Sequence, residues 1–230
     1  YGPYSSPYLL SLLGQKYRLT LKTFEENLAS YSRKIFEIGN INVYINPYYV
    51  PIGATYDQWI NESELDGKRT FEIEAGLIKY CVIDDSDSAN FNIFTKKSSP
   101  LFEDNYQLND FTTDIGLLKK DTLTISLFSP NRIEGNILLE KPKILFFSIP
   151  FDDGWTLLVD NIEYPFYRIN FGFIGTPLRQ GFHTIQIKYF PPHFKIGIAL
   201  SIIALLIFIP LLLREYFRRK SHDESILHGK

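Results

Sequence analysis

The chain has 230 residues and a net charge of −2 at neutral pH, which excludes the chain-wide basic surface typical of nucleic-acid-binding proteins. Its one cysteine, Cys81, excludes an internal disulfide, and we expect it to be a small buried residue. Aromatic residues make up 16% of the chain, which favours a β-rich core because Phe and Tyr pack well on pleated sheets. Composition leaves open the alternative that exposed rings stack on sugars.

Residues 1–68 predict a small α+β segment. Apolar residues at positions 9, 10, 12 and 13 indicate a short helix within 7–18. Residues 41–45, INVYI, alternate apolar and polar side chains, which is typical of a strand. The polar stretch 20–34 fits either a helix or a loop, and 61–68 is predicted to be a polar loop at a domain boundary.

Residues 69–193 predict an antiparallel β-sandwich, because short alternating runs recur every eight to twelve residues with turn signals between them. The expected strands are 71–77, 123–127, 133–140, 143–149, 155–159, 165–174 and 183–190. The run 143–149, KILFFSI, indicates a central strand that is buried on both faces. Residues 98–113 are expected to be loop-like. The acidic stretch 84–90 is interpreted as a solvated turn in preference to a calcium site, because its spacing does not fit an EF-hand.

The stretch Ile196–Leu213 contains no charged residue and is long enough, at about 27 Å as a helix, to cross a bilayer. We therefore predict one C-terminal transmembrane helix at 194–213, with the lipid bilayer as its partner. A cluster of basic residues follows it, which by the positive-inside rule places the tail 214–230 in the cytoplasm and the preceding domains outside. The residues predicted to set this topology and to meet lipid headgroups are Arg214, Arg218, Arg219 and Lys220.

The chain begins without a signal peptide and contains no methionine. An exported domain needs an export signal, so we expect a C-terminal fragment of a longer protein. The rival interpretation is a tail-anchored cytosolic protein, which would place the basic tail outside and violate the charge rule.

A carboxylate-rich turn beside a tryptophan is the most suggestive site. Its members are Asp152, Asp153, Trp155 and Asp160. A tryptophan beside carboxylates can stack on a sugar ring and accept hydrogen bonds from its hydroxyls. The structural interpretation, which we favour, is an Asp-Asp-Gly turn followed by a core tryptophan. The four histidines are scattered without metal-ligand spacing, so we predict no metal site and no catalytic residue in this chain.

Two blocks of the sequence resemble the YfhO family of bacterial multipass membrane proteins. The C-terminal block is ILFFSIPFDDGWTLLVDN followed by INFGFIGTPLRQGFHTIQIKYFPPHFKIG, which leads into the terminal helix. The N-terminal block is SLLGQKY followed by GNINVYINPYYVPIGATYD. The blocks lie in family order and leave residues from about 84 to 120 without a match.

The resemblance implies a parent protein with many membrane helices, similar to GT-C glycosyltransferases, in the bacterial cytoplasmic membrane. Such proteins take a sugar from a polyprenyl-phosphate carrier, with a divalent metal in some cases, and place it on a cell-envelope glycopolymer. The partners implied are that glycan and N-terminal membrane helices of the same chain, which also carry the catalytic acid. The alternative is a membrane-anchored, non-catalytic carbohydrate-binding or interaction module.

Overall fold

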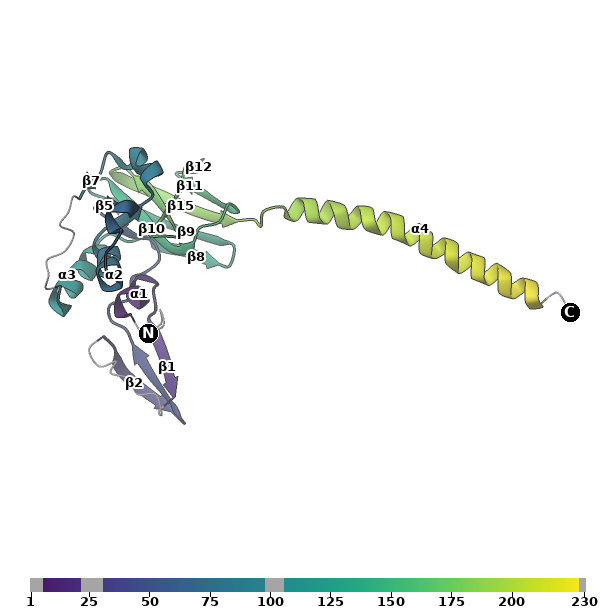
Figure 1. Ribbon diagram of the computed structural model, residues 1–230, viewed down its shortest axis with the longest axis horizontal. Coiled ribbons are helices and arrows are strands. Elements are labelled where there is room, and N and C mark those ends of the chain that lie inside the picture. Colours follow the sequence, from purple (N-terminus) through teal and green to yellow (C-terminus); the bar gives the residue numbers. More distant parts are fainter. Residues whose placement is uncertain (1–5, 22–30, 98–105, 228–230) are drawn as a thin grey trace. The chain divides into compact units, whose positions relative to one another are not determined.

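The computed structural model describes residues 6–21, 31–97 and 106–227 (Figure 1). The chain divides into a globular unit that ends at Lys188 and a second unit that begins at Tyr189 and contains the long C-terminal helix. Most elements of the globular unit are strands, which confirms the predicted mainly β class with one C-terminal apolar helix.

A five-stranded sheet forms one layer of the globular unit. Its spatial order is β12-β11-β15-β9-β8, and the hairpin pairs β8–β9 and β11–β12 and the long pair β9–β15 are antiparallel. The strands are β8 (Thr124–Ser129), β9 (Arg132–Leu139), β11 (Trp155–Val159), β12 (Ile162–Glu163) and β15 (Gly181–Tyr189). Each lies at or close to a predicted strand, apart from the short β12, which follows a tight turn with positive φ at Asp160 and Asn161.

A seven-stranded mixed sheet forms the next layer, in the order β4-β10-β14-β13-β6-β5-β7. Pairing is antiparallel from β4 to β6 and parallel among β6, β5 and β7. The strands are β4 (Ala54–Tyr56), β5 (Gln58–Asn61), β6 (Cys81–Ile83), β7 (Thr95–Lys96), β10 (Lys143–Pro150), β13 (Tyr167–Ile169) and β14 (Phe173–Leu178).

Strand β10 is buried on both faces, as its unbroken apolar sequence predicts. Leu145 and Phe147 belong to the core shared with the five-stranded sheet, which is the predicted sandwich. Ile144 and Phe146, which alternate with them, belong to a second core on the opposite face. The seven-stranded sheet is therefore the middle layer between the five-stranded sheet and a set of helices.

The second core is closed by three short helices and by 3-10 turns. They are α1 (Pro7–Leu12), α2 (Thr70–Lys79) and α3 (Leu108–Leu118), with the 3-10 turns η3 (Glu62–Leu65) and η4 (Asp85–Phe91). Leu12, Ile78 and Phe111 bring one buried side chain from each helix to this core. The predicted helix within 7–18 is confirmed as α1, and the predicted loop at 61–68 contains η3.

The prediction of a strand at 71–77 was wrong, because these residues form helix α2. The helix is fixed at its start by Glu72, whose carboxylate accepts a hydrogen bond from the backbone N–H of Arg69 at 2.8 Å. Its buried positions run consecutively from Ala75 to Ile78 and do not alternate as a strand would require. Glu, Ala and Leu also favour helix intrinsically.

Two further expectations were wrong. The part of the predicted loop 98–113 that the structure describes contains the first turns of α3, whereas 98–105 lie outside the described residues. The single strand expected at 165–174 is two strands, β13 and β14, joined by a tight turn with positive φ at Asn170 and Phe171. Buried Asn170 stabilises this turn, accepting a hydrogen bond from the backbone N–H of Val82 and donating one to the Tyr56 hydroxyl.

The predicted boundary at residue 68 does not separate two folding units. Strands β4 and β5 come before it, yet they pair with β10 and β6, which come after it. The expectation of a separate α+β segment failed because the helix between β5 and β6 was not recognised, and with it the parallel β5–α2–β6 crossover.

A separate three-stranded antiparallel sheet has the order β1-β3-β2. Its strands are β1 (Tyr17–Leu21), β2 (Arg33–Ile38) and β3 (Ile41–Ile45), and β3 confirms the strand predicted at 41–45. Strands β1 and β2 occupy the two ends of the stretch 20–34, which was predicted to be irregular, and residues 22–30 lie outside the described part.

The second unit consists chiefly of helix α4 (Phe194–Leu227). Its first 25 residues, Phe194–Arg218, include an 18-residue stretch with a mean hydropathy of 3.0 and are long and apolar enough to cross a membrane. Ser201 satisfies its hydroxyl within the helix by donating to the carbonyl of Gly197 at 2.8 Å. The helix contains Pro210 and continues beyond the predicted end at 213.

Buried Lys143 begins β10 and is held by two carboxylates. Its Nζ lies 2.9 Å from Asp57 Oδ1 and 2.7 Å from Asp121 Oδ2, and its side chain is only 4% exposed. Burial opposes the charged form of Lys143, but the two carboxylates outweigh it and raise its pKa. Burial also acts to raise the pKa of Asp57, and hydrogen bonds from Lys143 and Lys141 bring it below its usual value.

Replacing Lys143 with Ala is expected to lower the free energy of unfolding by about 3 kcal/mol, because Asp121 then loses its cation and Asp57 keeps only the exposed Lys141. The loss should shrink as pH falls, since a depressed carboxyl pKa contributes stability only above it. Thermal unfolding followed by circular dichroism measures this. Exposed Lys141, which also pairs with Asp57, is the control, and Lys141→Ala should cost about 1 kcal/mol or less. Equal losses would contradict the assigned role of Lys143.

Candidate functional site

The four residues singled out as a possible glycan site lie at the two ends of one strand. Asp152, Asp153 and Trp155 lie at the beginning of β11, whereas Asp160 follows its last residue. Five residues of strand separate the two groups by roughly 16 Å. Asp152 Oδ1 accepts a hydrogen bond from the backbone N–H of Gly154 at 2.7 Å, which is a local turn contact.

Trp155 packs against the core between the two large sheets. It is half-buried and shares its strand face with Leu157 and Val159, both of which are buried in the same core. This position supports the structural interpretation of the tryptophan.

Asp160 has a structural role, because it connects the β11–β12 hairpin to strand β15 by hydrogen bonds. It occupies the tight β11–β12 turn with a φ of 54°. Its carboxylate accepts from the backbone N–H of Thr184 at 2.8 Å and lies 2.9 Å from His183 Nδ1. Burial acts to raise its pKa, but the bonds from His183 and Thr184 outweigh this and lower it.

The basic residues predicted to meet lipid follow the apolar span of α4. Arg214 and Arg218 lie in the helix, and Arg218 Nη2 is 3.0 Å from Glu215 Oε1 one turn earlier. Arg219 and Lys220 continue the helical backbone.

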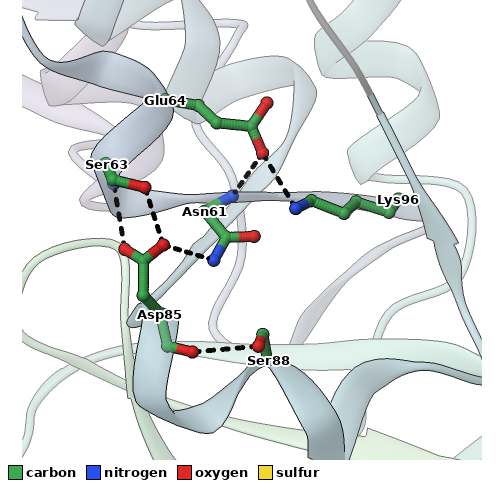
Figure 2. Close-up of polar contacts among 6 residues, drawn as sticks. All are labelled: Asn61, Ser63, Glu64, Asp85, Ser88 and Lys96. Carbon is green, nitrogen blue, oxygen red and sulfur yellow. Dashed lines mark hydrogen bonds and ion pairs between the residues drawn. The ribbon is translucent and has the colours of Figure 1, made fainter.

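A polar cluster not predicted from the sequence lies at the carboxyl ends of the parallel strands β5 and β6 (Figure 2). Asp85, just after β6, is its hub: Oδ1 accepts from Asn61 Nδ2 and from Ser63 Oγ, each at 2.6 Å, and Oδ2 accepts from the Ser63 backbone N–H at 3.1 Å. The carboxyl edge of parallel strands is where open sheets commonly bind ligands, because loops from adjacent strands converge there.

Lys96, at the end of β7, completes the cluster. Its Nζ lies 3.2 Å from Glu64 Oε1 and 5.3 Å from the ring centroid of Trp59. Glu64 also accepts a hydrogen bond from the backbone N–H of Asn61 at 3.3 Å. Figure 2 shows Asp85 and Glu64 approaching Asn61 from opposite sides. Together with Asn61, Ser63, Glu64 and Asp85, Lys96 lines an open hollow of about 370 Å³, which we call the carboxyl-end hollow.

Asn61 is the least satisfied member of the hollow. The residue is 7% exposed, and its Oδ1 is buried without a hydrogen-bond partner among the described residues. An unpaired buried acceptor costs about 1–3 kcal/mol, so native proteins retain few of them without a functional reason. A ligand with hydroxyl or amine donors would supply what this oxygen lacks.

The hollow is weakly acidic, with two carboxylates against one ammonium. The Ser63 hydroxyl and backbone N–H lower the pKa of Asp85, and hydrogen bonds from Ser86, with the guanidinium of Arg168 at 3.1 Å, lower that of the adjacent Asp84. Both aspartates are therefore anionic at neutral pH. Since Lys96 is already paired with Glu64, the hollow suits a neutral, hydroxyl-rich ligand better than a phosphate.

The divalent metal implied for the parent protein does not fit the part of the chain that the structure describes. There, no three His, Cys, Asp or Glu side chains gather closely enough to hold an ion. We therefore assign no metal chemistry to these residues.

A second hollow, of about 260 Å³, lies between β4 and helices α2 and α3 and includes Asp114. Burial raises the pKa of Asp114, and the Tyr106 hydroxyl donates a hydrogen bond to its Oδ2 at 3.0 Å. This pair accounts for the carboxylate structurally, so the carboxyl-end hollow is the stronger candidate site.

The sequence did contain one signal for the carboxyl-end hollow. Asn61 and Ser63 were assigned to a boundary loop and Asp85 to a separate acidic turn, about twenty residues apart. Recognition of 70–79 as a helix would have predicted a β–α–β crossover, which brings the ends of its two strands together.

Comparison with known proteins points to a membrane protein family. Residues 97–201 match the family model described as bacterial membrane protein YfhO. The chain is 30% identical over 121 residues to the uncharacterized protein YfhO of Bacillus subtilis (strain 168). The match covers 52% of this chain but only 13% of that relative, so the chain spans a small part of its length. No solved structure matches the chain.

Replacing Trp155 with Ala is expected to destabilise the globular unit by about 3 kcal/mol, because it removes a large ring from the inter-sheet core. Asp153→Ala, at the exposed turn beside it, should change stability by about 0.5 kcal/mol or less. Thermal unfolding and glycan binding measured on both variants provide the test. A Trp155→Ala protein of unchanged stability with weakened glycan binding would show that the tryptophan is a ligand-binding residue.

Proposed function

We propose, because this chain belongs to the YfhO family of bacterial membrane proteins, that it forms the extracytoplasmic globular part and last membrane helix of a multipass glycosyltransferase. The enzyme would transfer a sugar from a polyprenyl-phosphate carrier to a cell-envelope glycopolymer. The observation that carries the proposal is the family match itself, which runs from the globular unit into the apolar helix α4.

The proposed membrane is the bacterial cytoplasmic membrane, with the globular unit outside and the C-terminus in the cytoplasm. Arg214 and Arg218 directly follow the apolar span, with Arg219 and Lys220 next in sequence, whereas Lys195 and Lys188 are the nearest basic residues before it. This asymmetry supports a cytoplasmic C-terminus.

Within this proposal, the carboxyl-end hollow holds hydroxyls of the acceptor glycan. Sugar hydroxyls both donate and accept hydrogen bonds, and the hollow offers the carboxylate of Asp85, the amide oxygen of Asn61 and the ammonium of Lys96. We assign no catalytic residue to the described part of this chain, and its role is to position the acceptor.

The second candidate is a membrane-anchored carbohydrate-binding or interaction module without transferase activity. It is favoured by the character of the hollow, whose carboxylate, amide and ammonium groups can all hydrogen-bond a polyol.

The test uses the whole membrane protein from which the chain comes, in membrane vesicles supplied with radiolabelled polyprenyl-phosphate sugars and cell-envelope glycopolymer. The wild-type protein should transfer label to the polymer. Asp85→Asn should reduce transfer about tenfold through weaker acceptor binding, since it removes a charged acceptor. Asp66→Asn changes an exposed aspartate outside the hollow and should leave transfer unchanged.

The outcomes separate the two candidates. Glycopolymer binding that is weakened by Asp85→Asn, without transfer from any of the donors, would support the non-catalytic module. Transfer that is unaffected by Asp85→Asn at equal protein level would remove the hollow from the proposal.

A further inference from the structure

The three-stranded sheet β1-β3-β2 has one strongly apolar face. The register pairs Leu19 with Val43 and Leu21 with Ile41, and from the other side it pairs Phe36 with Val43 and Ile38 with Ile41. Residues directly opposite each other in an antiparallel pair project from the same face of the sheet. Tyr17, which pairs with Ile45, projects from this face as well. The exposed side chains on this face, which together we call the apolar face, are Tyr17, Leu19, Leu21, Phe36, Ile38 and Ile41.

The burial of this sheet is inverted relative to a sheet that faces water. Leu19 and Ile38, on the two edge strands, are 65% and 64% exposed, and on the apolar face Val43 of the central strand is the buried residue, whereas the polar face contains fully buried Asn42 and nearly buried Tyr44. A half-buried antiparallel sheet in a water-soluble domain normally directs its apolar side chains inward. A contiguous exposed apolar surface of this kind marks a protein or membrane contact.

Charge distinguishes between these contacts. Residues 16–21 and 31–45, which contain the sheet, include four basic side chains and one acidic side chain, a net charge of +3. They are Lys16, Arg18, Arg33, Lys34 and Glu37. Two copies of the sheet placed face to face would repel each other. The register places Arg33 on the apolar face, opposite Ile45, and Lys16 directly precedes Tyr17, whereas Arg18 and Lys34 pair with Tyr44 on the other face. An apolar surface with basic side chains at one end is instead suited to anionic lipid headgroups above an acyl layer.

The same chain contains the membrane-spanning candidate Phe194–Arg218, so a bilayer is available to this protein as a partner. We infer that the apolar face of β1-β3-β2 inserts shallowly into the interfacial region of an anionic bilayer, with Tyr17 and Phe36 at headgroup level. This membrane contact is independent of glycan binding in the carboxyl-end hollow, which is built from β5, β6 and β7.

The experiment labels one position on the apolar face of the full 230-residue chain, reconstituted by α4 into liposomes. The native Cys81 is fully buried, so Leu19→Cys provides the accessible thiol for an environment-sensitive nitrobenzoxadiazole probe. The matched control is Leu138→Cys on β9, which is 66% exposed on the five-stranded sheet. Quenching by lipids carrying a nitroxide near the headgroup reports contact with the bilayer.

In phosphatidylcholine liposomes containing phosphatidylglycerol, the probe at position 19 should shift to the blue and be quenched several-fold more than the probe at position 138. Omitting phosphatidylglycerol should reduce the difference, and so should Arg33→Glu. Ile38→Cys reports from the opposite edge strand and should behave like Leu19→Cys, which guards against a local effect of one substitution.

Equal quenching at positions 19 and 138 would overturn the inference. It would also be overturned if the blue shift at position 19 persisted in detergent without lipid and grew with protein concentration, because a second copy of the chain would then cover the face.

Discussion

The burial of β10 on both faces is the constraint on which the rest of the globular unit depends. Leu145 and Phe147 serve the core beneath the five-stranded sheet, and Ile144 and Phe146 serve the core beneath the helices. A slip of one residue in its pairing would exchange the two sets and disrupt both cores at once. Lys143 helps to prevent this, because its ion pairs with Asp57 and Asp121 fix the first residue of the strand.

This middle layer also determines where a ligand site forms. Pairing is antiparallel from β4 to β6 and becomes parallel where α2 provides the crossover from β5 to β6. Only the parallel part of the sheet places the carboxyl ends of neighbouring strands, and the loops that follow them, at the same edge. The hydrogen bonds of Asp85 then join the loop after β6 to Asn61 and Ser63, so one carboxylate both closes the edge and shapes the hollow.

The parts of the fold that were predicted correctly are those in which local pattern and tertiary burial agree. Alternation predicted β3 and β15, and an unbroken apolar run predicted β10, because one or both faces of each strand are covered. The alternating residues 71–77 were misleading, since in α2 a capping contact and helix packing decide the structure. The site was missed for the same reason: Asn61 and Asp85 become neighbours only through the crossover that α2 creates. The family resemblance, by contrast, came from local motifs, and the family model confirms it for the C-terminal block, over residues 97–201.

The two unusual surfaces of the globular unit lie where they interfere least with this core. The apolar face belongs to β1-β3-β2, which is hydrogen-bonded separately from the two large sheets, so its exposed side chains are not needed to fill either core. The carboxyl-end hollow lies beside the short strands β5–β7, where the sheet ends and polar groups can remain partly hydrated. An unsatisfied Asn61 oxygen in the hollow and exposed leucines on the apolar face each cost free energy in water. Since β10 and its two cores stabilise the unit independently, both surfaces can be kept for contacts that lie outside the domain itself.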